Sequence, residues 1–185
     1  MQLTDATDAL SLTRQMIDIP SVSGEEGPLA DAVEAALRGA GFGSVDTLEI
    51  LRDGDAVCAR THLGLPQRVV LAGHLDTVPI AENVPGRLEV RDGVEVVWGR
   101  GSVDMLGGCA AALALACEAG AVIRGGAREA LTADVTWIFY DHEEVASHLN
   151  GLGRIQRLYP QWLAGDLDLV GAQIAAHVEG GCNGT

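Results

Sequence analysis

The chain has 185 residues, of which 48% are hydrophobic and only 4% aromatic. This is enough for one domain with a sizeable core packed mainly by small aliphatic side chains. The formal net charge is −14, and every basic side chain apart from histidine is an arginine. So acidic a chain argues against nucleic acid and against an anionic membrane surface as partners.

Hydrophobic periodicity predicts alternating helices and strands. A helix from about Leu10 to Ile17 is expected to stop before Pro20, and Ser23-Gly24-Glu25-Glu26 has the pattern of a capping box that starts a second helix. The remaining expectations are strands at 45–51, 56–61 and 68–73, a hairpin at 87–99, a helix at 105–119, a strand at 135–140, a helix near 152–163 and a strand at 167–170. The alternation predicts an α/β fold, with a largely parallel or mixed sheet flanked by helices.

The four cysteines, Cys58, Cys109, Cys117 and Cys182, have no Cys-x-x-Cys spacing. We therefore expect reduced thiols and neither a disulfide framework nor a zinc knuckle. The N-terminus lacks the basic-then-apolar pattern of a signal peptide. The most apolar helix, around residues 109–117, is expected to be too short and too interrupted by glycine to span a bilayer. A cytoplasmic protein without a membrane partner is the resulting expectation.

The most informative run is Gly73 to Pro79, which places His74 and Asp76 two residues apart after an apolar stretch. In an extended segment residues i and i+2 point to the same side, so both are expected to face one site at a strand end. A metal-binding histidine usually needs a carboxylate or carbonyl on its second ring nitrogen. Taken by itself, the run is equally compatible with a solvated strand end.

Two later segments supply carboxylates. Asp104 lies in a glycine-flanked turn before an alanine-rich helix, and Glu143 and Glu144 follow a strongly apolar run. Ligands bind at the carboxyl ends of strands in open α/β sheets, so these side chains are expected to meet His74 there. A two-metal hydrolytic site needs a bridging carboxylate, flanking ligands and a base for water. Asp104 is suited to bridge the two metals, with His74 as a ligand of one metal and Glu144 as a ligand of the other. Glu143 is then left as the base.

In order and context, these three segments resemble the co-catalytic zinc amidohydrolases and metallopeptidases, a family that includes acetylornithine deacetylase, aminoacylase and succinyl-diaminopimelate desuccinylase. The run Asn150–Ile155 after the glutamates is most similar to desuccinylases of the actinobacterial type, and Glu179–Thr185 resembles the glycine-rich segment of the family. The resemblance implies that this chain is the N-terminal portion of a zinc-exopeptidase-like catalytic domain. It also implies two Zn²⁺ ions, replaceable by Co²⁺.

By this resemblance, His74 would ligate one metal, Asp76 would orient it, Asp104 would bridge, Glu143 would be the general base and Glu144 would bind the second metal. The implied reaction is hydrolysis of N-succinyl-LL-diaminopimelate to succinate and LL-diaminopimelate, a step in lysine biosynthesis, by a metal-activated water. The resemblance further implies a homodimer formed through a lid domain that residues 1–185 lack, as they lack the C-terminal part of the catalytic domain.

The sequence departs from the family at one ligand position. Ala172 stands where the family carries a metal-binding glutamate, and an alanine cannot ligate zinc. His177 or Glu179 is the alternative donor, although zinc geometry leaves little freedom for such a replacement. A single or weakly bound metal is therefore expected in this chain.

Three hypotheses follow from these observations. The first is the desuccinylase, and the second is a hydrolase of another N-acyl amino acid or of a peptide, of the acetylornithine deacetylase or carboxypeptidase type. The third is a non-catalytic remnant that binds at most one metal or a partner chain. The third predicts an exposed apolar surface and a tendency to self-associate.

Overall fold

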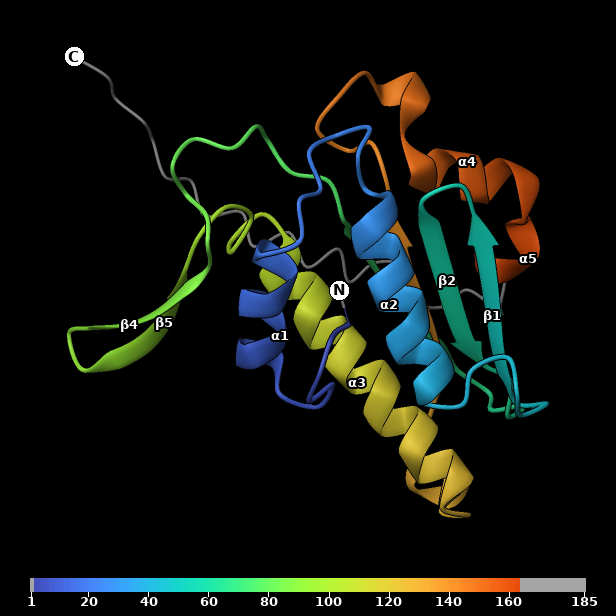
Figure 1. Ribbon diagram of the computed structural model, residues 1–185. Helices are drawn as coiled ribbons and strands as arrows, with labels where there is room; N and C mark the ends of the chain where they lie inside the picture. The colour runs from blue at the N-terminus through green and yellow to red at the C-terminus, as the bar shows by residue number, and fades with distance from the viewer. Residues whose placement is uncertain (1, 164–185) are drawn as a thin grey trace.

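The computed structural model describes residues 2–163 (Figure 1). Its helices are α1 (Ala9–Ile17), α2 (Gly27–Gly39), α3 (Leu106–Arg124), α4 (Gly151–Leu158) and α5 (Pro160–Leu163). Its strands are β1 (Leu48–Asp53), β2 (Ala56–Thr61), β3 (Arg68–His74), β4 (Arg87–Arg91), β5 (Val94–Trp98) and β6 (Asp134–Tyr140). Short 3-10 helices at Arg128–Ala130 and Ser147–Leu149 complete the described elements. The predicted strand at 167–170 lies outside the described residues.

The main sheet has the strand order β1-β2-β6-β3. Strand β3 runs parallel to β6, whereas β2 is antiparallel to both β1 and β6. The predicted α/β fold is thus confirmed, and the described strands form a mixed sheet. The parallel pair is the one that matters for function, because its register places His74 opposite Tyr140. The loops that follow these two residues therefore leave the same edge of the sheet.

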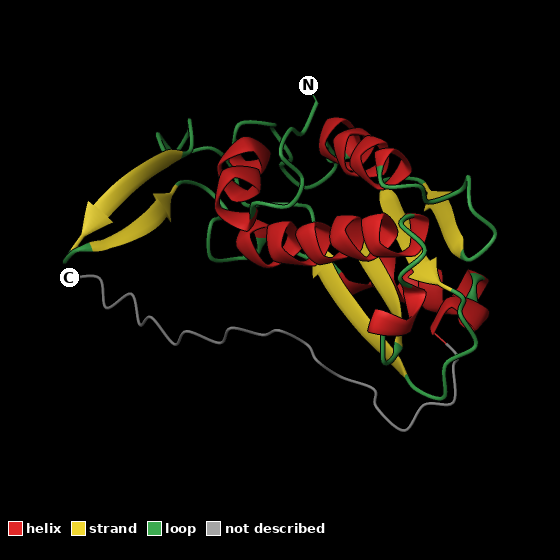
Figure 2. Ribbon diagram, turned by 90° about the horizontal axis from the view of Figure 1, so that it is seen from below, coloured by secondary structure: helices red, strands yellow, loops and turns green. Residues whose placement is uncertain are grey.

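Alternating side chains divide the core into two layers, one on each face of the sheet. On β6, Trp137 and Phe139 pack with α1, α2 and α3, whereas Ile138 and Tyr140 pack with Ile155 and Trp162 of α4 and α5. Successive side chains point to opposite faces, so the near-continuous apolar run of β6 is the pattern of a strand covered on both faces. Figures 1 and 2 show the resulting arrangement, with α1, α2 and α3 on one side of the sheet and α4 and α5 on the other.

Helix α3 corrects the prediction for the apolar segment. With 19 residues it continues to Arg124 through Gly120, which packs against the backbone carbonyl of Ala40 with no room for a Cβ. Within residues 2–163 it is the one helix long and apolar enough to cross a membrane by length and composition, so the expectation that it is too short was wrong. Half of its apolar stretch is buried inside the protein. Figure 2 shows it lying along the sheet between α1 and α2, the position of a core helix.

Two other boundaries differ from the prediction for local reasons. Strand β1 begins at Leu48 because residues 43–47 form turns closed by the hydrogen bonds Gly43 N–H to Leu48 O (2.7 Å) and Leu48 N–H to Val45 O (2.8 Å). The single helix expected at 152–163 is interrupted at Tyr159, since a residue before proline disfavours the helical conformation. The predicted hairpin is present, and Asp92 and Gly93 both have the positive φ that its tight turn requires.

A buried carboxylate at the start of β6 holds the opposite end of the sheet together. Asp134 is 3% exposed and accepts hydrogen bonds from Thr61 Oγ1 (2.7 Å) and from the backbone N–H groups of Leu63 (2.8 Å) and Leu65 (3.0 Å). Burial alone would raise the pKa of Asp134, but these donors stabilise the ionised form and lower it below its usual value.

Because the pKa of Asp134 is depressed in the folded state, its stabilising contribution is complete above the unfolded value of about 3.9 and is lost as the pH falls further. We expect Asp134→Asn to lower the free energy of unfolding at pH 7 by about 2 kcal/mol, since an amide leaves some of these donors without an acceptor. The variant should also lose stability less steeply than the wild type between pH 5 and pH 3. Urea unfolding across this range measures both effects, with the exposed Glu118→Gln on α3 as control. Equal acid slopes in Asp134→Asn and wild type would contradict the assignment.

Candidate metal centre

Three chain segments converge at the carboxyl end of the parallel strand pair. His74 is the last residue of β3, Asp104 lies in the turn before α3, and Glu144 lies in the loop after β6. One ligand atom from each of these three side chains lies within 4.8 Å of the others. We call His74, Asp104 and Glu144 the metal-ligand cluster. The structure thus brings together the three side chains that the sequence nominated as metal ligands.

His74 is held in one orientation. Its side chain is 3% exposed, its Nδ1–H donates to the backbone carbonyl of Asp76 (2.9 Å), and its Nε2 lies 3.1 Å from Asp104 Oδ1. Burial by itself would lower the pKa of His74, but the contacts with Asp76 and Asp104 raise it to about 9. With Nδ1 committed to Asp76, Nε2 is the nitrogen that faces the cluster and is free to act as a ligand once it loses its proton.

Asp76 connects this histidine to the loop of the two glutamates. It is completely buried, and its carboxylate accepts hydrogen bonds from the backbone N–H of Glu143 (2.9 Å), the backbone N–H of Glu144 (2.9 Å) and the hydroxyl of Ser23 (2.7 Å). Burial would raise the pKa of Asp76, but the contact with His74 and these donors keep it well below its usual value. Asp76 therefore fixes the histidine ring through its backbone carbonyl and the backbone of the glutamate loop through its carboxylate.

Glu143 and Glu144 make their structural contacts with Asp76 through backbone N–H groups, so their side chains are available to bind a metal or transfer a proton. Burial and the negative charge of Asp104 raise the pKa of Glu144, so the two carboxylates repel each other across the cluster. A cation between them would remove this repulsion. One imidazole nitrogen and two carboxylate oxygens form a donor set that zinc and cobalt accept. The residues present therefore fit a divalent metal ion.

Ser23 and Glu26 were not recognised from the sequence as part of this region. The predicted capping box was wrong: α2 begins at Gly27 without a side-chain cap. Instead, the hydroxyl of Ser23 donates to Asp76, and the completely buried Glu26 accepts the backbone N–H groups of Gly24 (2.8 Å) and His142 (3.2 Å). The Ser-x-x-Glu pattern is satisfied equally by a cap and by two side chains turned toward a site, and only tertiary packing distinguishes them.

A second set of buried charges lies behind the glutamate loop, and we call it the Arg154 network. The guanidinium of Arg154 spans two carboxylates: it donates to Asp141 through Nη1 (3.2 Å) and Nη2 (2.9 Å), and to Asp53 Oδ1 through Nε (2.6 Å). The hydroxyl of Tyr159 donates to Asp53 (2.9 Å), and His142 Nδ1 lies 2.9 Å from Asp141. His142 therefore contacts the carboxylates behind the loop, and this network anchors Asp141, two residues before Glu143.

The remaining candidates lie elsewhere or outside the described residues. His62 and His148 are exposed. Cys58, Cys109 and Cys117 are buried free thiols, and burial raises the pKa of Cys58 and Cys109 to about 12. Ala172, His177, Glu179 and Cys182 lie outside the described residues.

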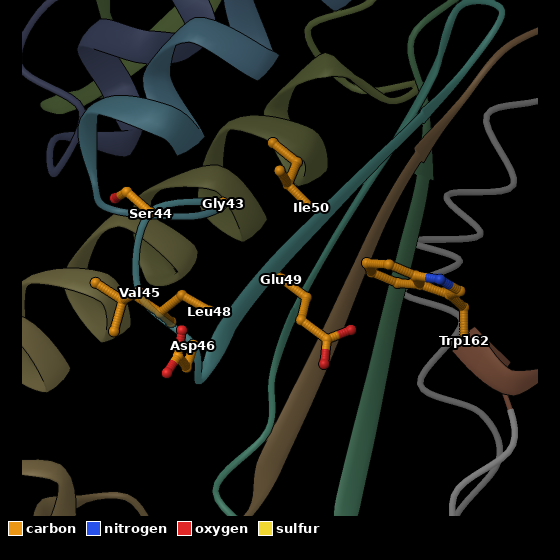
Figure 3. A pocket seen from close by; sticks show the side chains of 8 residues that line it. All are labelled: Gly43, Ser44, Val45, Asp46, Leu48, Glu49, Ile50 and Trp162. Atoms are coloured by element: carbon orange, nitrogen blue, oxygen red, sulfur yellow. The ribbon is translucent and has the colours of Figure 1, made fainter.

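A cavity of about 370 Å³ lies beside the edge strand β1 (Figure 3). Its carboxylates are Asp46 and Glu49, and Figure 3 shows Trp162 on the opposite wall. Glu49 is paired with Arg60 at 2.7 Å, and the Arg60 guanidinium stacks on the ring of Trp162 at 4.5 Å. None of the residues that line this cavity belongs to the metal-ligand cluster.

Comparison with known proteins agrees with this arrangement. The chain is 45% identical over 183 residues to the succinyl-diaminopimelate desuccinylase of Corynebacterium glutamicum, covering 96% of this chain and 44% of the relative. It therefore spans less than half the length of that relative.

In structure it resembles human carnosine dipeptidase 1 (TM-score 0.60, 19% identity, 86% of this chain and 37% of that one). It also resembles Bacillus subtilis YXEP, a dinuclear metal-binding peptidase of the M20 family (TM-score 0.50, 18% identity, 82% and 39%). These two likenesses support the fold. Residues 70–185 match the sequence pattern of Peptidase family M20/M25/M40, and the chain belongs to that family.

Proposed function

We propose that this chain is the N-terminal portion of the catalytic domain of a succinyl-diaminopimelate desuccinylase. The observation that carries the proposal is the position of His74, Asp104 and Glu144 within 4.8 Å of one another, beside a glutamate loop whose backbone is fixed by Asp76. The proposed substrate is that named for the relative from Corynebacterium glutamicum. On this proposal the full protein cleaves N-succinyl-LL-diaminopimelate, an N-acyl amino acid, with one water to give succinate and LL-diaminopimelate.

The proposed cofactor is Zn²⁺, with Co²⁺ as a substitute. His74 would bind one ion and Glu144 would bind the other, while Asp104 would bind both. This is the arrangement of ligands expected for a dinuclear site. Within this chain each ion would then have two protein ligands, because Ala172 cannot take the place of a glutamate ligand. Catalytic zinc sites usually have three protein ligands. We therefore expect this chain to bind one metal ion, or two weakly, unless His177 or Glu179 contributes a donor.

The chain's own residues have separable tasks in the proposed reaction. A divalent metal supplies the Lewis acidity that makes an amide carbonyl susceptible to attack by water. Glu143 takes the proton from the attacking water and delivers it to the leaving nitrogen. Asp76 keeps His74 in the orientation that presents Nε2, and it holds Glu143 and Glu144 through their backbone N–H groups. Mobility of this loop would misplace base and ligand together.

We further propose that the protein is cytoplasmic and that the full-length form dimerises through a lid domain beyond residues 1–185. A second candidate function is a metal-binding remnant without activity, favoured by Ala172. A metal-dependent hydrolase of another N-acyl amino acid or of a peptide is a further candidate. Substrate profiling separates the desuccinylase from the other hydrolase, and turnover separates both enzymes from the remnant.

The test is hydrolysis of N-succinyl-LL-diaminopimelate by the purified chain with added Zn²⁺. If the site is active, we expect Glu143→Ala to reduce kcat by about 10²–10⁴-fold, the usual contribution of a general base, while metal affinity changes little. Glu118→Ala, an exposed position on α3, is the matched control. Equal turnover in Glu143→Ala and Glu118→Ala would contradict the role of Glu143. Metal binding without turnover in the wild type would favour the remnant.

A further inference from the structure

The carboxylate of Glu26 reaches the glutamate loop from a distant part of the chain. Glu26 directly precedes α2, is 0% exposed and lies 116 positions before His142. Its Oε1 accepts the backbone N–H of His142 (3.2 Å), and its Oε2 accepts the backbone N–H of Gly24 (2.8 Å). Burying a carboxylate carries a large desolvation cost unless hydrogen bonds compensate for it. These two hydrogen bonds therefore tie the loop after β6 to the start of α2.

His142 has a backbone conformation that few side chains adopt. Its φ is +60°, in the left-handed region, where the Cβ of any residue other than glycine is crowded by its own backbone. Such a conformation persists when contacts with the rest of the protein fix it. The N–H group of His142 is held by Glu26, and its ring Nδ1 lies 2.9 Å from Asp141 Oδ2 and 3.6 Å from Glu26 Oε1. Because this turn comes directly before Glu143, it sets the direction of the chain through the two glutamates.

Two completely buried carboxylates together bind three consecutive backbone N–H groups of this loop. Glu26 accepts from His142, whereas Asp76 accepts from Glu143 and Glu144, both at 2.9 Å. Asp76 fixes the two amides that follow the left-handed residue, and Glu26 fixes the amide at its start. A rotation of His142 out of the left-handed region would break at least one of these hydrogen bonds, because the amides on both sides of the rotated bonds are held.

We infer that Glu26 is a positioning residue for the proposed base Glu143 and the proposed metal ligand Glu144, acting through the left-handed backbone of His142. This role rests on the metal site proposed above. Neither Glu26 nor His142 belongs to the metal-ligand cluster, so the effect of Glu26 on a metal ion is indirect. Glu26 is suited to the task because it adjoins a helix packed on the sheet, and rigid elements position a site more precisely than loops do.

The test combines Co²⁺ titration of the purified chain with amide hydrogen exchange measured by NMR without metal. Glu26→Met keeps a side chain of similar length but removes both acceptor oxygens. We expect it to weaken Co²⁺ binding by about tenfold, the lower end for residues that support metal ligands indirectly, and to change the absorption spectrum of bound Co²⁺. The His142 amide should exchange about tenfold faster, as for one lost hydrogen bond. Glu25→Met, the same change at the adjacent exposed position, should alter none of these.

Equal Co²⁺ affinity in Glu26→Met and Glu25→Met would overturn the role of Glu26, and so would equal exchange of the His142 amide. A wild type that binds no Co²⁺ would instead contradict the metal site itself, while the exchange rates would still show whether Glu26 holds the loop. If Glu26→Met does not fold, Glu26→Gln replaces it. Glutamine has one acceptor oxygen for two N–H groups, so the amide of Gly24 or of His142 should exchange faster. Unchanged exchange at both amides would overturn the role.

A pair of substitutions at His142 tests the left-handed backbone independently of Glu26. Both His142→Gly and His142→Ala remove the ring, but only glycine adopts a positive φ without strain. We therefore expect the unfolding equilibrium constant of His142→Gly to be about tenfold smaller than that of His142→Ala. Urea unfolding measures both. If His142→Ala were the more stable variant, as at an ordinary backbone position, Glu26 would not act through a left-handed His142 and the inference would fail.

Discussion

Asp76→Ala is expected to weaken Co²⁺ or Zn²⁺ binding by about 100-fold, the upper range for loss of a residue that orients a metal ligand. We also expect the free energy of unfolding to fall by about 3 kcal/mol or more. The physical reason is that one buried carboxylate accepts three hydrogen bonds and lies 3.5 Å from His74 Nδ1. Its removal leaves the N–H groups of Glu143 and Glu144 without their acceptor and takes away the negative charge beside the His74 ring. Calorimetry with Zn²⁺ and urea unfolding measure the two effects.

Two variants separate the contributions of Asp76. Ser23→Ala removes a single donor to the same carboxylate, and we expect it to cost about 1 kcal/mol with little change in metal affinity. Asp76→Asn keeps the shape and one acceptor oxygen but loses the charge, so it should fall between Ser23→Ala and Asp76→Ala. If Asp76→Ala bound metal as tightly as the wild type, the proposed metal site would not depend on the Asp76 carboxylate, and the role assigned to that side chain would be wrong.

Arg154→Met is expected to lower the free energy of unfolding by about 3 kcal/mol, because it leaves Asp53 and the nearly buried Asp141 without their shared cation. Metal affinity should fall as well, since Arg154 anchors Asp141, three residues before the proposed metal ligand Glu144. Arg154→Lys should recover only part of the loss, because an ammonium group cannot donate to both carboxylates with the fixed fork of a guanidinium. Urea unfolding and zinc titration measure these effects.

The matched control for Arg154 is Arg157→Met, an exposed position on the same helix, α4. It removes the same charge from the chain and should leave stability within about 0.5 kcal/mol of the wild type. If the two variants lost equal stability, the effect would reflect net charge and not the buried contacts of Arg154. If Arg154→Met unfolded more easily yet kept full metal affinity, the network would stabilise the fold without positioning the glutamate loop.

Sequence alone determined the elements and the metal-ligand cluster for local reasons. Short apolar runs predicted β3 and β6, and Asp92-Gly93 predicted the turn of the hairpin, because strand and turn geometry depend on neighbouring residues. His74 and Glu144 lie at or after strand ends, and Asp104 lies before a helix. Because ligands bind at the carboxyl ends of strands in α/β sheets, these three residues were predicted to meet at one edge of the sheet. The run Asn150–Ile155 also has a local reason: a Cβ on Gly151 would collide with the carboxylate of Asp141.

Tertiary structure decided which polar side chains support that cluster. Ser23 and Glu26 match a helix cap, yet they turn to Asp76 and to the loop at His142 because partners more than 50 residues away offer better hydrogen bonds. The pairing of Arg154 with Asp53 likewise joins residues 101 positions apart. Burial and hydrogen-bond partners are properties of the packed chain, and periodicity in the sequence reports only which face of an element is apolar.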